Sequence, residues 1–157
     1  MNVKNILVPT DFSFSSFKAL ELGHSMAEQH SAILHLLHII DPVQRHTNPG
    51  FNTTEEALMA FAESEFAKVI SQIPASTIEI KQAVSKGKPY QKILDYSKEN
   101  HIDLIIMATR GKSNHNYALM GSVAERVVRF SGIPVITLKS DTIYDDKKPF
   151  SINSNLA

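Results

Sequence analysis

The stretch "MATRGKSNHNYALMGSVAERV", residues 107–127, holds the junction that decides the fold. An apolar segment ends here, a polar loop containing Gly111 follows, and a helix-like pattern begins after Gly121. Ser122 and Glu125 have the spacing of a capping box, which favours a helix start at this point. The loop is either an ordinary connection or a backbone that closes around a ligand. Three valines of the helix are expected to face inward: Val123, Val127 and Val128.

Five short apolar runs are typical of buried strands. They are "NILVP" (5–9), "AILHLLHII" (32–40), "TIEIKQAV" (77–84), "DLIIMA" (103–108) and "IPVITLK" (133–139). The run 103–108 is the most apolar, so we expect it to form a central strand. The run 77–84 alternates between apolar and polar residues in its first half, which predicts a half-exposed strand at a sheet edge.

The segments between these runs have apolar residues three and four apart, as amphipathic helices do. Ser13 or Asp11 could cap the first helix, Thr53 and Glu56 form a capping box for the second, and Pro89 suits the first turn of the third. The helices are expected over 13–30, from Thr53 to Pro74, over 89–100 and from Ser122 to Gly132. Their inward residues are expected to be Ala19, Leu20, Gly23, Met26 and Ala27, then Leu58, Phe61, Ala62, Phe66 and Val69.

The alternation of strands and helices predicts an α/β fold, in which a parallel sheet has helices on both faces. The length of 157 residues suits a single domain, which we place over residues 1–140. Residues 141–157 show no sustained periodicity, so we expect a polar and mostly disordered tail.

The composition excludes several classes of protein. Sixteen basic residues balance sixteen acidic ones, so no overall charge would attract nucleic acid or an anionic membrane. The absence of cysteine excludes disulfides, thiol catalysis and thiolate metal sites. No signal-peptide pattern and no apolar run long enough for a membrane span are present. We expect a soluble cytoplasmic protein with neither nucleic acid nor membrane as a partner.

A ligand site is expected at the carboxyl ends of the strands, where strand order reverses. If the first and fourth strands are neighbours, Asp11, Ala108, Gly111, Gly121 and Ser122 converge there. Glycines let a ligand approach the backbone, and a helix start attracts anions. This pattern indicates phosphate binding, helped by the positive charges of Arg110 and Lys112. The alternative is that Ser122 and Asp11 only cap their own helices.

No catalytic or metal-binding set is visible. The phosphate loop G-x-x-x-x-G-K-[ST] and the dinucleotide pattern G-x-G-x-x-G are both missing. His35 and His38 should point to opposite faces of their strand and so cannot share a metal ion. His38 is expected to be structural, with a place in the pocket wall as the alternative. The other histidines are expected at the surface: His24, His30, His46, His101 and His115.

A phospho-receiver domain has a similar number of strands and helices. It needs clustered acids after the first strand and an aspartate after the third. Here Asp11 stands alone after the first strand, and Ser85, Lys86 and Gly87 follow the third. We therefore set this class aside.

The loop residues resemble the pattern G-x-x-G, nine residues, G-[ST] of the universal stress protein family of ATP-binding type. This chain has Ala108-Thr109-Arg110-Gly111, nine residues, then Gly121-Ser122, with supporting matches in "ILVPTDFS" (6–13), "LLHIID" (36–41) and "GSVAERVVRFSGIPVITLK" (121–139). The resemblance covers residues 3–139. It implies an open five-stranded parallel sheet of order 3-2-1-4-5, an adenine nucleotide alpha hydrolase-like fold. The first glycine is replaced by Ala108, whose methyl group is tolerated if φ is negative.

The resemblance also implies a function. It indicates an ATP-binding, dimeric regulator or signalling module of the bacterial stress response, at most a very slow ATPase, with Mg²⁺ bound through the phosphates. ADP or AMP could replace ATP, the dimer would form through the last strand (Val135–Lys139), and the protein partners stay unidentified. The implied nucleotide-binding residues are Pro9, Thr10, Asp11, Ile39, Ala108, Arg110, Gly111, Gly121, Ser122 and Val123. The alternative is a dimeric adaptor of the same fold that binds no nucleotide and acts through protein contacts.

Overall fold

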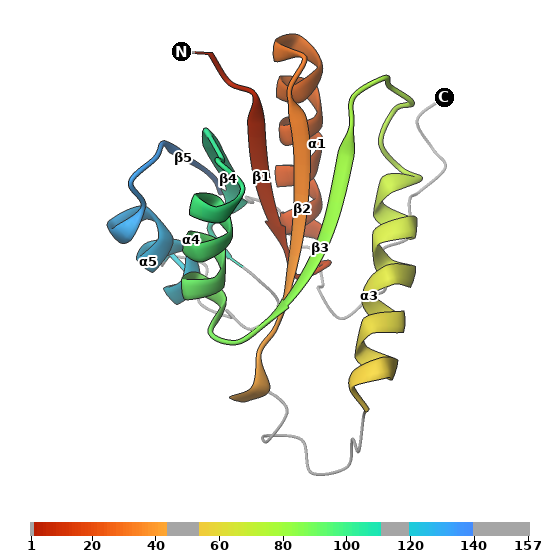
Figure 1. The fold of residues 1–157 in the computed structure, drawn as a ribbon, viewed down its shortest axis with the longest axis vertical. Helices are drawn as coiled ribbons and strands as arrows, with labels where there is room; N and C mark the ends of the chain where they lie inside the picture. The colour runs from red at the N-terminus through yellow and green to blue at the C-terminus, as the bar shows by residue number, and fades with distance from the viewer. Residues whose placement is uncertain (1, 44–53, 111–119, 140–157) are drawn as a thin grey trace.

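The computed structural model describes residues 2–43, 54–110 and 120–139. Its middle layer is one parallel sheet in the order β3-β2-β1-β4-β5 (Figure 1). The strands are β1 (Asn5–Thr10), β2 (Ile33–Ile40), β3 (Ile80–Lys86), β4 (Leu104–Ala108) and β5 (Val135–Leu138). The predicted order is confirmed, with β3 at an edge and β1 beside β4. The interior strand β4 is buried along its whole length, although β1 holds the middle position.

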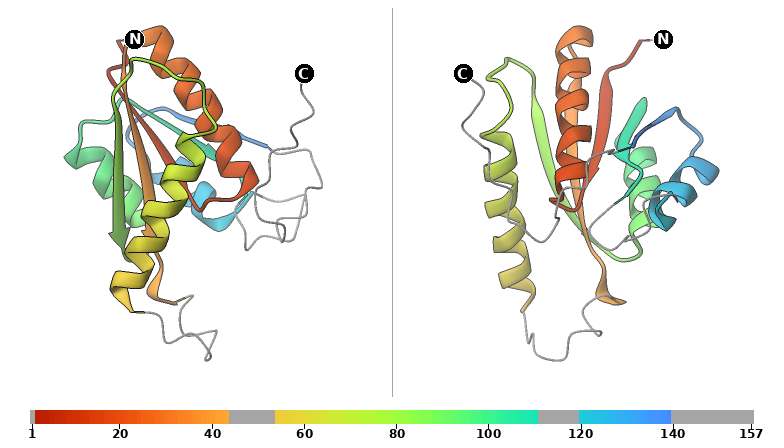
Figure 2. Two further views of the ribbon diagram at one scale, coloured as in Figure 1. Left: turned by 90° about the vertical axis from the view of Figure 1, so that its right-hand side faces the viewer. Right: turned by 180° about the vertical axis from the view of Figure 1, so that it is seen from behind.

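Helices cover both faces of the sheet, as predicted. They are α1 (Phe14–His30), α3 (Glu55–Ile70), α4 (Pro89–Glu99) and α5 (Ser122–Phe130). Right-handed crossovers place α1 and α3 on one face and α4 and α5 on the other (Figure 2). Strand residues alternate between the two cores, since Ile6 and Val8 pack in the α1–α3 core and Leu7 packs in the α4–α5 core.

The helix α1 packs closely on the sheet. Ser13, not Asp11, is its N-cap, because the Ser13 hydroxyl accepts a hydrogen bond from the Ser16 N–H at 3.2 Å. Gly23 faces the sheet as predicted, and a Cβ at this position would lie 2.6 Å from a methyl group of Val8. The absence of a side chain therefore sets the distance between the helix and β1.

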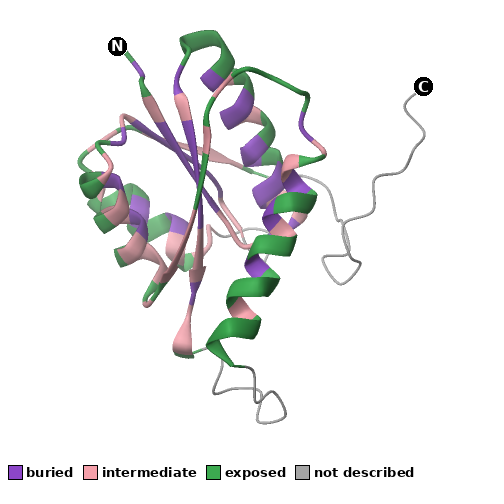
Figure 3. Ribbon diagram, turned by 45° about the vertical axis from the view of Figure 1, so that its right-hand side comes forward, coloured by how far each residue is buried: buried purple, intermediate pink, exposed green. Residues whose placement is uncertain are grey.

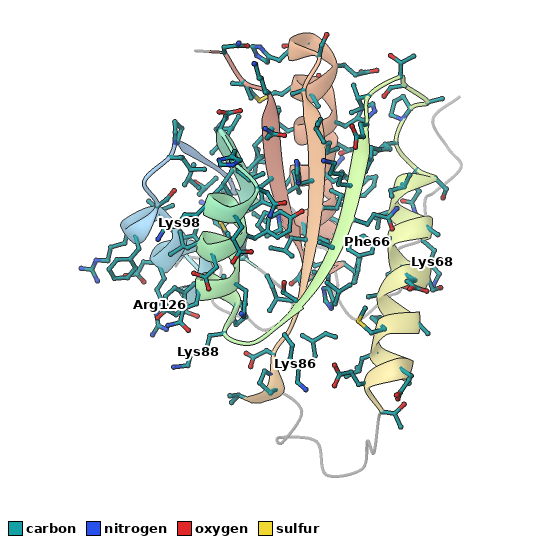
Figure 4. All side chains as sticks on the ribbon, viewed as in Figure 1. Phe66, Lys68, Lys86, Lys88, Lys98 and Arg126 are labelled. Atoms are coloured by element: carbon teal, nitrogen blue, oxygen red, sulfur yellow. The ribbon has the colours of Figure 1, made fainter. Side chains whose placement is uncertain are left out.

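The helix α3 starts later than predicted and buries fewer residues. Its N-cap is Thr54, whose hydroxyl accepts from the Ala57 N–H at 3.2 Å, while Thr53 lies outside the described residues. Phe66 points from α3 toward the sheet and Lys68 away from it (Figure 4). Phe61 is half exposed, contrary to prediction, because one residue turns a helix by about 100° away from Ala62 and the rest of the buried stripe.

The strand β3 also differs from its predicted range of 77–84. It pairs with β2 from Leu34–Ile80 to Ile40–Lys86, so its bounds follow the neighbouring strand rather than its own alternation. The other strands match their predicted ranges to within two residues. Gly87, which follows β3, has a φ of 142° and donates its N–H to the Ile40 carbonyl, a conformation that favours glycine.

The helix α5 corrects two predictions. Its N-cap is Gly121, Ser122 is already the first helical residue, and no side chain caps the helix. The predicted capping box is therefore wrong. Ala124 and Val127 form the buried stripe, whereas Val128 is 47% exposed because it is rotated away from them. Figure 3 shows this general pattern, with buried positions along the strands and on the sheet-facing sides of the helices.

The amino end of the sheet is closed by polar contacts. Asp103 accepts hydrogen bonds from the N–H groups of Lys4 (2.8 Å) and Asn5 (2.9 Å). His35 is buried, its Nε2–H donates to the Asn5 side-chain oxygen at 3.2 Å, and its Nδ1 accepts from the Tyr96 hydroxyl at 3.0 Å. Every polar atom named here has its partner inside the protein.

The environment of this network changes two pKa values. Burial lowers the pKa of His35, nearby Lys81 lowers it further, and Glu79 opposes the shift. Burial raises the pKa of the Tyr96 hydroxyl. Both groups are therefore neutral near pH 7, as the hydrogen bond between them requires.

The predictions for the histidines are confirmed in part. His35 and His38 do lie on opposite faces, because one contacts Tyr96 of α4 and the other contacts the Phe12 ring. The surface prediction is wrong for His24, which is buried on α1 with its Nε2 3.1 Å from the Ser76 hydroxyl. His30 and His101 are exposed, whereas His46, His115 and the tail 141–157 lie outside the described residues.

Candidate functional site

A cavity of about 650 Å³ lies at the carboxyl ends of β1, β2 and β4, toward the lower end of the sheet in Figure 1. The chain moves in opposite directions from β1 and from β4, so this is the point where strand order reverses. The cavity is lined by all the predicted nucleotide-binding residues except Gly111, which lies outside the described residues: Pro9, Thr10, Asp11, Ile39, Ala108, Arg110, Gly121, Ser122 and Val123. The structure thus brings these residues together, and their binding of a nucleotide stays a prediction.

The turn after β1 is held by local hydrogen bonds. The Phe12 N–H donates to the Thr10 hydroxyl at 3.0 Å, and the Ser13 N–H donates to the Asp11 carboxylate at 3.0 Å. Phe12 has a φ of 61°, which bulky side chains rarely adopt. Its ring is buried in the α1–α3 core, and this packing holds the turn in its unusual conformation. The turn places Asp11 at the cavity.

His38 has both of the roles that its sequence position left open. Its Nδ1–H donates to the Thr10 carbonyl at 2.9 Å, which ties the end of β2 to the end of β1. The same ring lies 4.6 Å from the Phe12 ring and lines the cavity. The register of the two strands explains this position, because Thr10 and His38 are directly paired.

The loop that follows β4 leaves and re-enters the fold at one point. The Thr109 N–H donates to the Leu138 carbonyl at 2.9 Å, and the Thr109 carbonyl accepts from the Gly121 N–H at 2.6 Å. Ala108, the last residue of β4, is not among the described non-glycine residues with positive φ. Its methyl group therefore causes no backbone strain at the position where the family pattern has glycine.

The first turn of α5 faces the cavity. Ser122, Val123 and Ala124 line it, and their N–H groups have no partner within the helix because they precede the first helical hydrogen bond, from Glu125 to Gly121. Ser122 does not cap the helix, so the alternative that it only serves its own helix is wrong. A helix start with three such N–H groups, with Arg110 also in the wall, favours an anionic ligand at this end.

The rest of the cavity wall has an apolar part and two acidic residues. Ile39, Ile93 and Met107 give the wall that faces α4 and α5. Asp11 and Asp41 follow the ends of β1 and β2 and also line the cavity. A ligand with a flat apolar part and an anionic part matches this distribution.

Several lining residues were missed by the sequence analysis. Asp41 and Thr109 directly follow predicted strands and Met107 lies near the end of one, so their positions could have identified them. The positions of the lining residues on helices depend on how the helices pack against the sheet, and no local sequence pattern marks them. The additional residues are Ser16, Asp41, Phe61, Pro89, Ile93, Met107, Thr109, Met120 and Ala124.

Two further properties concern the described residues alone. Over residues 2–43, 54–110 and 120–139, no group of three His, Asp or Glu side chains is placed to hold a metal ion. In the same ranges, every helix is too short or too polar to span a lipid bilayer.

Comparison with known proteins identifies relatives along nearly the whole chain. The model of the universal stress protein family matches residues 2–139. Universal stress protein MJ0531 of Methanocaldococcus jannaschii is 27% identical over 139 residues, which covers 87% of this chain and 82% of the relative. The solved structure of protein MJ0577 from the same organism has a TM-score of 0.79 and 28% identity, and the match covers 90% of this chain and 99% of that one.

Two more distant structures share the fold and contain nucleotides. One is a universal stress protein in complex with cAMP, with a TM-score of 0.63 and 20% identity over 88% of this chain and 98% of that one. The other is a universal stress protein of Archaeoglobus fulgidus in complex with dAMP, with a TM-score of 0.60 and 20% identity over 87% and 98% of the two chains. At 20% identity, these two comparisons show that the fold is shared and nothing more.

Proposed function

Since this chain belongs to the universal stress protein family, we propose that its cavity binds an adenine nucleotide, ATP in the first place and ADP or AMP as shorter forms. The protein would act as a cytoplasmic, homodimeric regulator of a stress response rather than as an enzyme. The occurrence of cAMP and dAMP in two proteins of the same fold supports an adenine nucleotide as the ligand.

The observation that carries the proposal is the uncapped first turn of α5. Ser122, Val123 and Ala124 line the cavity, their N–H groups have no partner within the helix, and no side chain caps the helix start. A helix start in this condition stabilises phosphate oxygens through hydrogen bonds and through its positive dipole end.

The charges of the lining residues support one orientation of the ligand. Phosphates would lie at α5 and Arg110, because Asp11 and Asp41 repel them from the other end. The base would lie against the apolar wall of Ile39 and Met107, where burial of a flat ring is favourable. Mg²⁺ would be held by the phosphates themselves, since the described residues provide no metal cluster.

Turnover is expected to be slower than about one per second, below the range of ordinary enzymes. Backbone N–H groups, Ser122 and Arg110 would bind the phosphates in the ground state and the transition state to similar degrees, which tightens binding without accelerating the reaction. Fast phosphoryl transfer needs a positioned water or acceptor. Asp11 is the acid nearest the sequence motif, and the family resemblance implies that it lies at the adenine end, far from the terminal phosphate. Single-turnover hydrolysis at saturating protein tests this, and a faster rate that a point change in the loop abolishes would contradict it.

Calorimetric titration of the protein with ATP and Mg²⁺ tests the binding site. Gly121→Val adds a branched side chain at the start of α5, with a φ of −63° that valine adopts readily. We expect its affinity for ATP to fall by at least about tenfold, since the N–H groups are obstructed. Gly132→Val is the matched control, because a Cβ at Gly132 meets nothing within 4 Å. Unchanged ATP affinity in the Gly121 variant would show that the phosphates lie elsewhere.

The dimer is proposed to form through β5. In the described part of the sheet this strand pairs with β4 alone. The carbonyls of Pro134 and Leu138 accept from β4, so by alternation the N–H of Thr137 points to the open edge. A second copy related by two-fold symmetry could pair there.

Thr137→Pro removes this outward N–H and leaves the bonds to β4 in place. We expect the variant to be monomeric by light scattering at micromolar concentration, with Thr137→Val dimeric as its control. A monomeric parent chain would rule out the dimer. An adaptor that binds no nucleotide remains the second candidate, and nucleotide that co-purifies with the parent chain would exclude it.

A further inference from the structure

The lining of the cavity includes side chains from both faces of the sheet, at the carboxyl ends of the strands. On β2, Leu36 packs in the α1–α3 core and Leu37 in the α4–α5 core. Because side chains alternate along a strand, His38 faces the α1–α3 side and Ile39 the α4–α5 side, and both line the cavity. Thr10 and Pro9 repeat this arrangement at the end of β1. The cavity is therefore lined from both faces of the sheet, and we call the part lined by residues of the α1–α3 side the α1–α3 lobe.

The lobe on the α1–α3 face has an aromatic wall. Phe61 of α3 lines it and is 50% exposed, so part of its ring surface is accessible to a ligand. Its ring stands edge-on to the Phe12 ring with centroids 6.1 Å apart, and Phe12 in turn contacts His38 at 4.6 Å and Phe66 at 5.2 Å. This aromatic group, from Phe66 in the core to Phe61 at the cavity, holds the exposed ring in place.

The charges of this lobe differ from those of the α5 end. Its described lining residues are Thr10, Ser16, His38 and Phe61, with Asp11 and Asp41 following the strand ends, and Lys and Arg are absent from this set. Two carboxylates disfavour an anionic group here. An aromatic wall favours a flat ring that is neutral or cationic. Phosphate and ring therefore belong to different parts of the cavity.

We propose that the α1–α3 lobe is a second ring-binding subsite, which accepts a nucleoside in addition to the nucleotide on the α4–α5 face. This inference rests on the proposed nucleotide function. The second nucleoside is a separate molecule rather than the other half of a dinucleotide, because a phosphate bridge would have to pass the carboxylates of Asp11 and Asp41. Phe61 provides the face against which its base stacks.

The chain lacks tryptophan, so Phe61→Trp introduces a single fluorescent reporter into the lobe. We expect its emission to be quenched by adenosine added to the ATP-saturated protein, and less by P1,P4-di(adenosine-5′) tetraphosphate, whose phosphate bridge the two carboxylates disfavour. ATP alone should leave most of the emission. Phe130→Trp is the matched control, because Phe130 is 59% exposed on α5 and is not among the cavity-lining residues.

Phe61→Ala tests the energetic role of the ring. We expect the affinity ratio of the preferred second-ring ligand to ATP to fall about tenfold, as stacking of a base on an aromatic side chain predicts. Phe61→Leu, which keeps apolar bulk without a flat face, should give an intermediate ratio. Melting temperatures of the variants check that the half-exposed position tolerates each change.

Two results would overturn the second subsite while ATP still binds. One is an unchanged affinity ratio in Phe61→Ala together with no quenching by either second-ring ligand. The other is complete quenching of Phe61→Trp by ATP alone, which would make Phe61 part of the first base site. If ATP does not bind to the parent chain, the proposed function fails as well.

Discussion

The two ends of the sheet treat their polar groups in opposite ways. At the amino end, the Asp103 carboxylate binds the N–H groups of Lys4 and Asn5, and both ring nitrogens of His35 have protein partners. At the carboxyl end, Ser122, Val123 and Ala124 of the uncapped first turn of α5 line a cavity. The amino end stabilises the fold, while the carboxyl end holds the proposed ligand site.

This difference follows from the parallel arrangement of the strands. Each strand feeds the amino terminus of the next helix at the same end of the sheet, so unpaired N–H groups collect there. At the opposite end, short loops pack directly against neighbouring strands, such as the loop with Asp103 that joins α4 to β4. Changes at the amino end should therefore affect stability, and changes at the carboxyl end should affect binding.

The largest expected effect is that of His35→Ala at the amino end. The change removes a buried ring and leaves the Tyr96 hydroxyl and the Asn5 side-chain oxygen without the partners described above. We expect a loss of about 3 kcal/mol in the free energy of unfolding, measured by urea denaturation. ATP affinity should stay within about twofold, since His35 is not among the cavity-lining residues. A loss below about 1 kcal/mol would mean that the network contributes little to stability.

An intermediate effect separates two serines at helix starts. Ser13 caps α1, so Ser13→Ala should lower the free energy of unfolding by about 1 kcal/mol. Ser122 makes no cap, so Ser122→Ala should change it by less than about 0.5 kcal/mol and instead weaken ATP binding. Chemical denaturation and calorimetric titration of both variants provide the comparison. Equal destabilisation by the two changes would remove the distinction between the ends.

The smallest expected effect is a pH dependence of stability from His35. Burial lowers its pKa in the folded state below the ordinary value of 6.5, so the unfolded chain binds more protons near and below that pH. The contribution is complete above pH 6.5 and is lost as the pH falls toward the folded-state pKa. The free energy of unfolding should therefore fall between pH 7 and pH 6.

His35→Gln is the control for this dependence, because glutamine does not titrate. Denaturation of the parent and the variant at several pH values should show a shallower slope in the variant over this range. Identical slopes would assign the pH dependence to other groups.

The sequence predicted the strands and helices well where burial leaves a periodic pattern. The run 103–108 became an interior strand, and the half-exposed run 77–84 became the edge strand β3, shifted by its pairing with β2. The helix start after Gly121 was correctly placed at the carboxyl end of the sheet, whereas the loop residues 111–119 lie outside the described residues. These features depend on local patterns and on general rules for parallel sheets.

Errors arose where a local pattern competed with a tertiary contact. Ser122 and Glu125 have capping-box spacing, yet the hydrogen bond from the Gly121 N–H to the Thr109 carbonyl sets where the chain enters α5, and Gly121 becomes the N-cap. His24 looked like a surface residue, but α1 packs closely enough on the sheet to bury it beside Ser76.

The sequence by itself determined the alternating α/β pattern, the family resemblance and the motif residues at the strand ends, because hydrophobic periodicity and spacing are properties of the chain. Only the tertiary structure decided which side chains complete the cavity. Phe61 looked like an ordinary core residue of an amphipathic helix. The rotation of α3 against the sheet turned it toward the cavity, and the buried ring of Phe12 holds it there. Helix rotation depends on packing between distant segments, which local sequence patterns do not specify.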